Sequence, residues 1–137
     1  MALLQTTNVV KRFGGLTAVN KMTFSVDAGK IVSIIGPNGA GKTTFFNSLT
    51  GIYKPEEGQI LFKDNSLIGL RPDQVAATGI ARTFQNIRLF GSMTVIENIL
   101  VGMHIQLKQG AVDTLFRTKK FNEEDKEAEN RAKDLMA

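Results

Sequence analysis

Apolar and polar residues alternate along two stretches near the start of the chain. Residues 4–12 and 18–27 show this pattern, most clearly in Met22-Thr23-Phe24-Ser25-Val26. Successive side chains of a strand point to opposite faces of a sheet, so the alternation predicts strands with one buried face. Gly14-Gly15 lies between the two stretches and predicts a turn. We therefore expect an antiparallel pair of strands.

A continuous apolar run follows. Ile31-Val32-Ser33-Ile34-Ile35 has almost no polar face, which predicts a strand covered on both sides, as in a parallel core sheet. Residues 27–30 form a turn into it. Residues 44–49 are expected to form a helix that Gly51 terminates.

Turn residues divide the middle of the chain. Residues 54–58 predict a turn before a short strand at 59–62. Arg71-Pro72-Asp73 predicts a helix start with Pro72 at its first position, and Gly79 predicts its end. Residues 80–85 are a further strand candidate.

The last third is less regular. Apolar residues at helical spacing over 93–107 predict a helix, whereas residues 108–120 read as an irregular connection. Asn122, followed by three acidic residues, predicts the cap of a final helix. Ala128, Ala132 and Leu135 would form its thin apolar side.

A complete phosphate-binding loop joins the apolar run to the helix at 44–49. Its pattern is G-x-x-x-x-G-K-[ST], and its residues are Gly36, Pro37, Asn38, Gly39, Ala40, Gly41, Lys42 and Thr43. Glycines let the backbone wrap a polyphosphate, and the helix N-terminus adds positive potential. Lys42 can reach the β- and γ-phosphates, and the Thr43 hydroxyl can ligate Mg²⁺. A chance glycine-rich turn is the alternative, but the strand–loop–helix setting favours a nucleotide site.

The composition of the chain excludes several classes of protein. The 137 residues make one domain, and the absence of cysteine excludes disulfides and thiol chemistry and suits a reducing cytosol. The N-terminus does not resemble a secretory signal, and no apolar stretch reaches the roughly 20 residues of a membrane span. Residues 122–137 hold six acidic and three basic side chains, so the net charge of +4 divides into −3 there and +7 on residues 1–121. The basic residues form no helical stripe, which argues against nucleic acid and favours phosphate ligands or anionic lipid.

Four segments together resemble the ATP-binding subunits of ABC transporters, within the branched-chain amino-acid importer branch. Residues 12–19, Arg-Phe-Gly-Gly-Leu-Thr-Ala-Val, resemble the adenine-stacking strand end, and residues 36–44 match the family's phosphate loop. Arg82-Thr83-Phe84-Gln85 with Leu89-Phe90 resembles the Q-loop, and residues 93–99 resemble the helix behind it. Residues 106–121 are similar to an insertion in the larger of that importer's two ATP-binding subunits. The resemblance implies an α/β P-loop NTPase core with an N-terminal antiparallel β-subdomain, of which residues 1–137 are the N-terminal part.

The resemblance also implies ligands and partners. The adenine of ATP would stack on Phe13 beside Val19. The residues from Gly36 to Thr44 would bind its phosphates. Lys42 and Gln85 would be catalytic, and Thr43 and Gln85 would hold Mg²⁺. The Gln85 loop would dock a transmembrane permease subunit, and a second ATP-binding subunit would complete the motor, on the inner face of the cell membrane. The alternatives are a strand-end aromatic for Phe13 and an ordinary loop glutamine for Gln85.

Several motor elements do not occur in the sequence. There is no L-S-G-G-Q-type signature and no apolar run ending in Asp-Glu, so the Walker B aspartate and catalytic glutamate are missing. His104, the only histidine, falls in the helical pattern at 93–107 and reads as structural. We therefore expect a chain truncated before these elements, inactive alone and poorly stable.

Other functions stay open at this point. A GTPase is disfavoured because the only Asn-Lys pair, Asn20-Lys21, precedes the loop and continues with Met22-Thr23. A small-molecule kinase would usually start nearer its loop. A nucleotide-binding module without turnover and an ABC protein outside transport remain possible.

Overall fold

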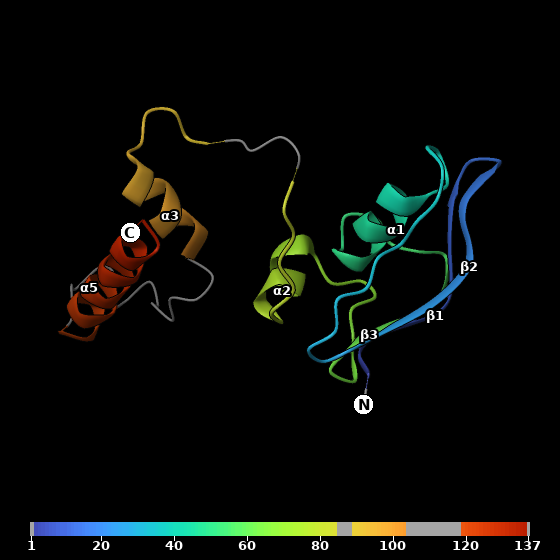
Figure 1. Ribbon diagram of the computed structural model, residues 1–137, viewed down its shortest axis with the longest axis horizontal. Coiled ribbons are helices and arrows are strands. Elements are labelled where there is room, and N and C mark those ends of the chain that lie inside the picture. Colours follow the sequence, from blue (N-terminus) through green and yellow to red (C-terminus); the bar gives the residue numbers. More distant parts are fainter. Residues whose placement is uncertain (1, 85–88, 104–118, 137) are drawn as a thin grey trace. The chain divides into compact units, whose positions relative to one another are not determined.

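The computed structural model describes residues 2–84, 89–103 and 119–136, with the side chains of 119–125 excepted. The chain divides into two compact units, Met1–Arg82 and Thr83–Ala137. The N-terminal unit contains the sheet and helices α1 and α2, and the second contains helices α3 and α5 (Figure 1).

A four-stranded sheet forms the frame of the first unit. Its strands are β1 (Ala2–Phe13), β2 (Leu16–Asp27), β3 (Glu57–Phe62) and β4 (Asn65–Ser66), in the order β2-β1-β3-β4. Every pairing among them is antiparallel. The turn between β1 and β2 falls at Gly14, whose φ is +56°, so the predicted N-terminal strand pair and its glycine turn are confirmed.

Strand β1 is bent in its middle, and a glycine of β3 accommodates the bend. The pairing of β1 with both neighbours shifts near Thr7 and Asn8, and Asn8 itself has φ +49°. A Cβ on Gly58 would lie 2.5 Å from the carbonyl oxygens of both Thr7 and Asn8. Only a glycine lets β3 approach the bent strand this closely.

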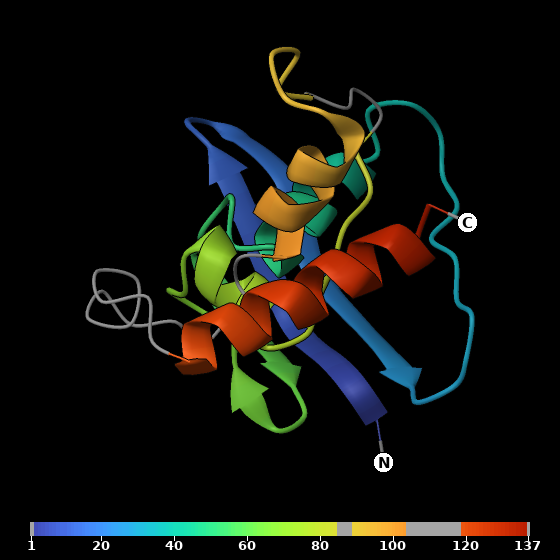
Figure 2. The same cartoon turned by 90° about the vertical axis from the view of Figure 1, so that its left-hand side faces the viewer.

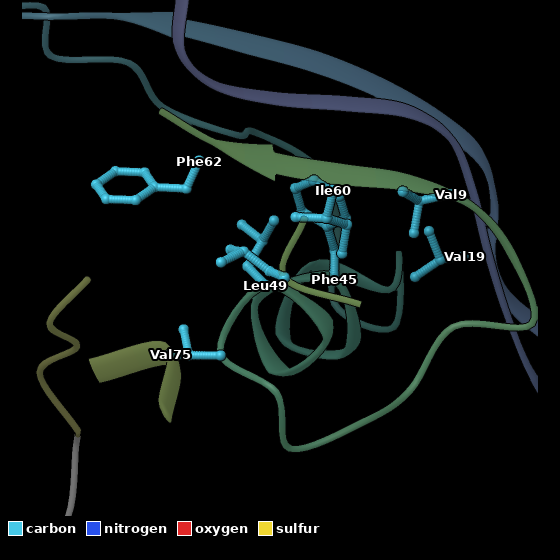
Figure 3. Close-up of a cluster of buried hydrophobic side chains, with 8 residues drawn as sticks. Val9, Val19, Phe45, Leu49, Ile60, Phe62 and Val75 are labelled. Atoms are coloured by element: carbon cyan, nitrogen blue, oxygen red, sulfur yellow. The ribbon is translucent and has the colours of Figure 1, made fainter. Parts of the chain in front are cut away.

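Helix α1 (Lys42–Leu49) covers one face of this sheet. Figure 3 shows its side chains Phe45 and Leu49 pointing toward Ile60 of β3, and all three are buried. Helix α2 (Pro72–Ala77) adds Val75 to the same core. The buried cluster consists of Val9, Val19, Phe45, Leu49, Ile60, Phe62, Leu67 and Val75. The predicted helices at 44–49 and after Arg71 and the strand at 59–62 are confirmed, with boundaries one or two residues away.

The apolar run 31–35 does not form a strand, contrary to prediction. Residues 30–37 have no regular secondary structure, and Ile31 and Ile35 are fully or almost fully exposed, at 102% and 92%. A strand requires a hydrogen-bonded neighbour, and in the described part of the chain every strand pairs only within the antiparallel sheet. The strand predicted at 80–85 is likewise absent over 80–84, and Gln85 lies outside the described residues.

The second unit contains two helices that lie side by side, α3 (Val95–Met103) and α5 (Lys119–Asp134) (Figure 2). A capping box precedes α3: the Thr94 N–H donates to Glu97 Oε2 at 2.7 Å, and the Glu97 N–H donates to Thr94 Oγ1 at 3.3 Å. The helix predicted over 93–107 is therefore confirmed as far as Met103. His104 and Leu107 lie outside the described residues, as do residues 104–118 of the predicted connection.

Helix α5 starts earlier than predicted. It begins at Lys119, so Asn122 lies inside the helix and is not its cap. No glycine or proline separates Lys119 from Asn122, and their helix propensities allow the extra turn. Ala128 and Ala132 are buried as expected, whereas Leu135 lies beyond the helix end and is 74% exposed. None of the helices in the described residues is both long and apolar enough to cross a membrane.

Candidate nucleotide site

The segment from Gly36 to Gly41 forms a tight loop that leads directly into α1. The Ala40 N–H donates to the carbonyl oxygen of Pro37 at 3.3 Å, and the Phe45 N–H donates to that of Gly41 at 2.8 Å. Gly39 and Gly41 have φ of +83° and +80°, which only glycine adopts without strain. The chain can therefore turn sharply and begin a helix at Lys42, which leaves the free N–H groups of the first helical turn at the loop.

Gly41 also lies against the backbone of β2. A Cβ at this position would be 2.1 Å from the carbonyl oxygen of Ala18 and 3.7 Å from the Val19 side chain. No real side chain tolerates the first distance. The loop is thus held next to the strand that follows the Phe13 turn.

Lys42 places its ammonium group inside the loop. Its Nζ donates to the carbonyl oxygens of Gly36 and Pro37 at 2.6 and 2.7 Å. A polyphosphate bound in the loop would offer the same ammonium its charged oxygens, which make stronger hydrogen bonds than neutral carbonyls. The cation therefore lies at the loop backbone, bonded to its first two carbonyl oxygens.

The threonines after Lys42 occupy the first turn of α1. Thr43 is exposed and Thr44 is half-buried. The carbonyl oxygen of Thr44 accepts a hydrogen bond from Ser48 Oγ at 3.0 Å. The exposed Thr43 hydroxyl is a hard oxygen donor beside a lysine, a combination that fits Mg²⁺ bound together with phosphate.

A hollow of about 260 Å³ lies beside the loop, between β2 and residues 34–42. Val19, Ile34, Gly41 and Lys42 are among the residues that line it. Val19 itself is buried and packs near Val9 in the core (Figure 3). Val19 therefore both lines the hollow and packs in the core beneath the sheet.

Phe13 stands at the end of β1 with 42% of its surface exposed. Its ring meets the Tyr53 ring edge-on, with centroids 5.1 Å apart and an interplanar angle of 77°. Lys11 Nζ lies over the Phe13 ring at 5.2 Å from its centroid. Sequence reasoning identified Phe13 but missed these neighbours. Tyr53 is the only tyrosine in the sequence, and it lies directly before the predicted turn at 54–58. This position was the one feature of the sequence that could have singled out Tyr53.

Two salt bridges join the end of β1, next to Phe13, to the segment that follows Tyr53. Lys11 pairs with Glu56 and Arg12 pairs with Glu57, at 2.5 and 2.6 Å. The Lys11 ammonium and the Arg12 N–H both donate to the Glu56 carboxylate, and these hydrogen bonds lower the Glu56 pKa below its usual value. Glu56 is therefore charged at neutral pH.

The segment before Gln85 is attached to α1. Arg82 Nη1 donates to Asn47 Oδ1 at 2.7 Å, on the helix that begins at Lys42. Thr83 and Phe84, which follow, are exposed. Gln85, the predicted catalytic glutamine and Mg²⁺ ligand, lies outside the described residues, so its position relative to the loop stays a prediction.

The family model of the ABC transporter matches residues 19–137. The chain belongs to the ABC transporter family. Among its curated relatives, the high-affinity branched-chain amino acid transport ATP-binding protein LivG of Escherichia coli strain K12 is 52% identical over 130 residues, which cover 95% of this chain and 51% of that protein. The corresponding protein BraF of Pseudomonas aeruginosa is 45% identical over 126 residues, 92% of this chain and 49% of the relative.

Solved structures agree with this assignment to the ABC family. The ADP conformation of an ATP-binding cassette of an ABC transporter has a TM-score of 0.70 and 39% identity over 87% of this chain and 46% of that one. A nucleotide-free cassette has a TM-score of 0.72 and 37% identity over 94% and 51%. The fold is thus that of the N-terminal part of an ABC ATPase, and the chain spans about half the length of the relatives that it matches.

Proposed function

We propose that this chain is the nucleotide-binding half of the ATP-binding subunit of an ABC importer, which couples ATP binding and hydrolysis to uptake of branched-chain amino acids. The observation that supports this most directly is its 52% identity with LivG over 95% of the chain. The phosphate loop, with the Lys42 ammonium bonded to two of its carbonyl oxygens, supports the proposal because such a loop would bind the phosphates of ATP.

Different residues around the loop would bind the phosphates, the base and the Mg²⁺ of the nucleotide. The backbone from Gly36 to Thr44 would bind the phosphates, and Lys42 would neutralise charge on the β- and γ-phosphate oxygens. Phe13 would stack on adenine, with Val19 behind it. Thr43 and Gln85 would hold Mg²⁺, which when bound draws negative charge from the transferred phosphoryl group.

The proposal extends to partners. The Gln85 loop would dock a transmembrane permease subunit, and the exposed side chains of Leu89 and Phe90 support an interface in this region. A second ATP-binding subunit would close on the first, with the motor at the inner face of the cell membrane. Phosphoryl transfer requires a residue that positions the attacking water, and residues 1–137 contain no Asp-Glu pair of that kind. The 137-residue chain alone would therefore bind ATP without turning it over.

The test is to reconstitute the full-length subunit with its permeases and solute-binding protein and to measure ATP hydrolysis against a panel of amino acids, sugars and peptides. We expect stimulation by leucine, isoleucine or valine and none by sugars or peptides. The Lys42→Ala subunit serves as control and should hydrolyse no ATP above background under any condition. Stimulation by sugars or peptides alone would overturn the substrate assignment and leave the motor assignment intact.

A further inference from the structure

The Phe13 ring is contacted by two side chains from different parts of the chain. Tyr53, in the segment after α1, meets it edge-on at a centroid distance of 5.1 Å. Lys11, two residues before it on β1, places its ammonium 5.2 Å from the centroid of the same ring. Phe13 nevertheless keeps 42% of its surface exposed, so part of the residue remains accessible to a ligand.

Lys11 is itself held in place. Its Nζ donates to Glu56 Oε1 at 2.5 Å and to the carbonyl oxygen of Lys54 at 3.0 Å, and its side chain is only 13% exposed. The other Glu56 oxygen accepts the Arg12 N–H at 2.7 Å, directly before Phe13 in the chain. The segment 53–56 therefore fixes both the ammonium over the ring and the backbone that leads to the ring.

We propose that Lys11 and Tyr53 are positioning residues of the base site, which fix the Phe13 ring as a platform for a purine base. The inference rests on the proposed function, because it takes Phe13 as the stacking residue. A ring that rotates freely loses rotamer freedom when a base stacks on it, whereas a ring already fixed by its neighbours has lost that freedom on folding. The cation and the edge-on ring thus raise affinity for the nucleoside without touching it.

Comparing Mg–ATP with Mg–tripolyphosphate distinguishes a role at the base site from a general effect on folding. Mg–tripolyphosphate carries the phosphates but no base, so it reports only on the loop. We expect Lys11→Met and Tyr53→Leu each to weaken Mg–ATP binding by about two- to tenfold, the range set by exposed cation–π and aromatic pairs. Affinity for Mg–tripolyphosphate should stay within about twofold, since the side-chain interactions of both residues in the described part of the chain are with Phe13, Lys54 and Glu56.

The chain offers a matched control. Lys63 Nζ lies 5.2 Å from the centroid of the Phe62 ring, the same distance as for Lys11 and Phe13, at the C-terminal end of β3. Lys63→Met should leave the affinities for both ligands unchanged. Lys11→Arg keeps the cation and should retain most of the affinity for Mg–ATP. This variant keeps the proposal testable if the Lys11→Met chain folds poorly.

Tyr53 provides an independent readout, because the chain has one tyrosine and no tryptophan. Its fluorescence should change when Mg–ATP binds and stay constant with Mg–tripolyphosphate. Equal losses of affinity for both ligands in the Lys11→Met and Tyr53→Leu chains, or no loss for either, would overturn the positioning role. If the unaltered chain bound neither ligand, the proposed function would fall, and this inference with it.

Discussion

Replacing Lys42 by alanine is expected to lower the affinity for Mg–ATP by about 10- to 100-fold, the size of a lost hydrogen bond to a charged group. The Lys42 ammonium lies within hydrogen-bond distance of two loop carbonyls and so within the loop that would hold the phosphates. Without it, the charge of the β- and γ-phosphates would be met by backbone N–H groups alone. Titration calorimetry of both chains measures the difference.

Two controls sharpen this experiment. Lys63→Ala removes an exposed lysine of the β3–β4 turn and should leave the affinity unchanged, which excludes an effect of net charge alone. Circular dichroism should show both variant chains folded, because the side-chain hydrogen bonds of Lys42 among the described residues are to loop carbonyl oxygens and its side chain lies outside the buried cluster. Equal affinity with and without Lys42 would mean that the nucleotide binds elsewhere.

The Gly41→Ala chain is expected to lose about 2–5 kcal/mol of its free energy of unfolding, the sum of a left-handed alanine and an overpacked contact. The added Cβ would lie 2.1 Å from the carbonyl oxygen of Ala18, so either the loop or β2 has to move. A loss of this size is a large part of the stability of a small domain. Urea denaturation followed by circular dichroism measures it.

Gly39 provides the matched comparison for Gly41. The two residues have nearly the same φ, +83° and +80°, but a Cβ on Gly39 would meet no atom within 4 Å. Gly39→Ala should therefore cost only the conformational part, about 1–2 kcal/mol. Equal losses in the two variants would show that the contact between the loop and Ala18 does not matter for stability.

Glycines and prolines made much of the fold predictable. Gly14, Gly51 and Gly79 have positive φ where a strand pair turns and two helices end, and Pro72 begins a helix. These residues act through their own backbone, so a local pattern is sufficient to place the elements. The phosphate loop was predictable for the same reason, because its function lies in backbone conformation.

Predictions that depended on distant residues were less successful. The run at 31–35 is apolar on both faces, but a strand also requires a neighbour, and the described residues offer it none. The start of α5 at Lys119 reflects the absence of a helix breaker more than the presence of a cap. Local sequence carries no information about partners further along a chain.

The surroundings of Phe13 were also beyond sequence reasoning. Tyr53, Lys54 and Glu56 lie 40 or more positions away in the chain, and only the pairing of β1 with β3 brings them to the end of β1. The Arg82–Asn47 hydrogen bond, across 35 positions, is of the same kind. Contacts of this length follow from topology, which local patterns do not encode.

The central claim is that this chain binds Mg–ATP in the loop from Gly36 to Thr44, with the base at Phe13. It is tested most directly by titrating the isotopically labelled 137-residue chain with Mg–ATP and following its backbone amides by NMR. We expect large shifts for the amides of Gly39, Gly41 and Lys42 and for Phe13, and the same loop shifts without the Phe13 shift when Mg–tripolyphosphate is added. Shifts confined to other parts of the chain, or none at millimolar nucleotide, would contradict it.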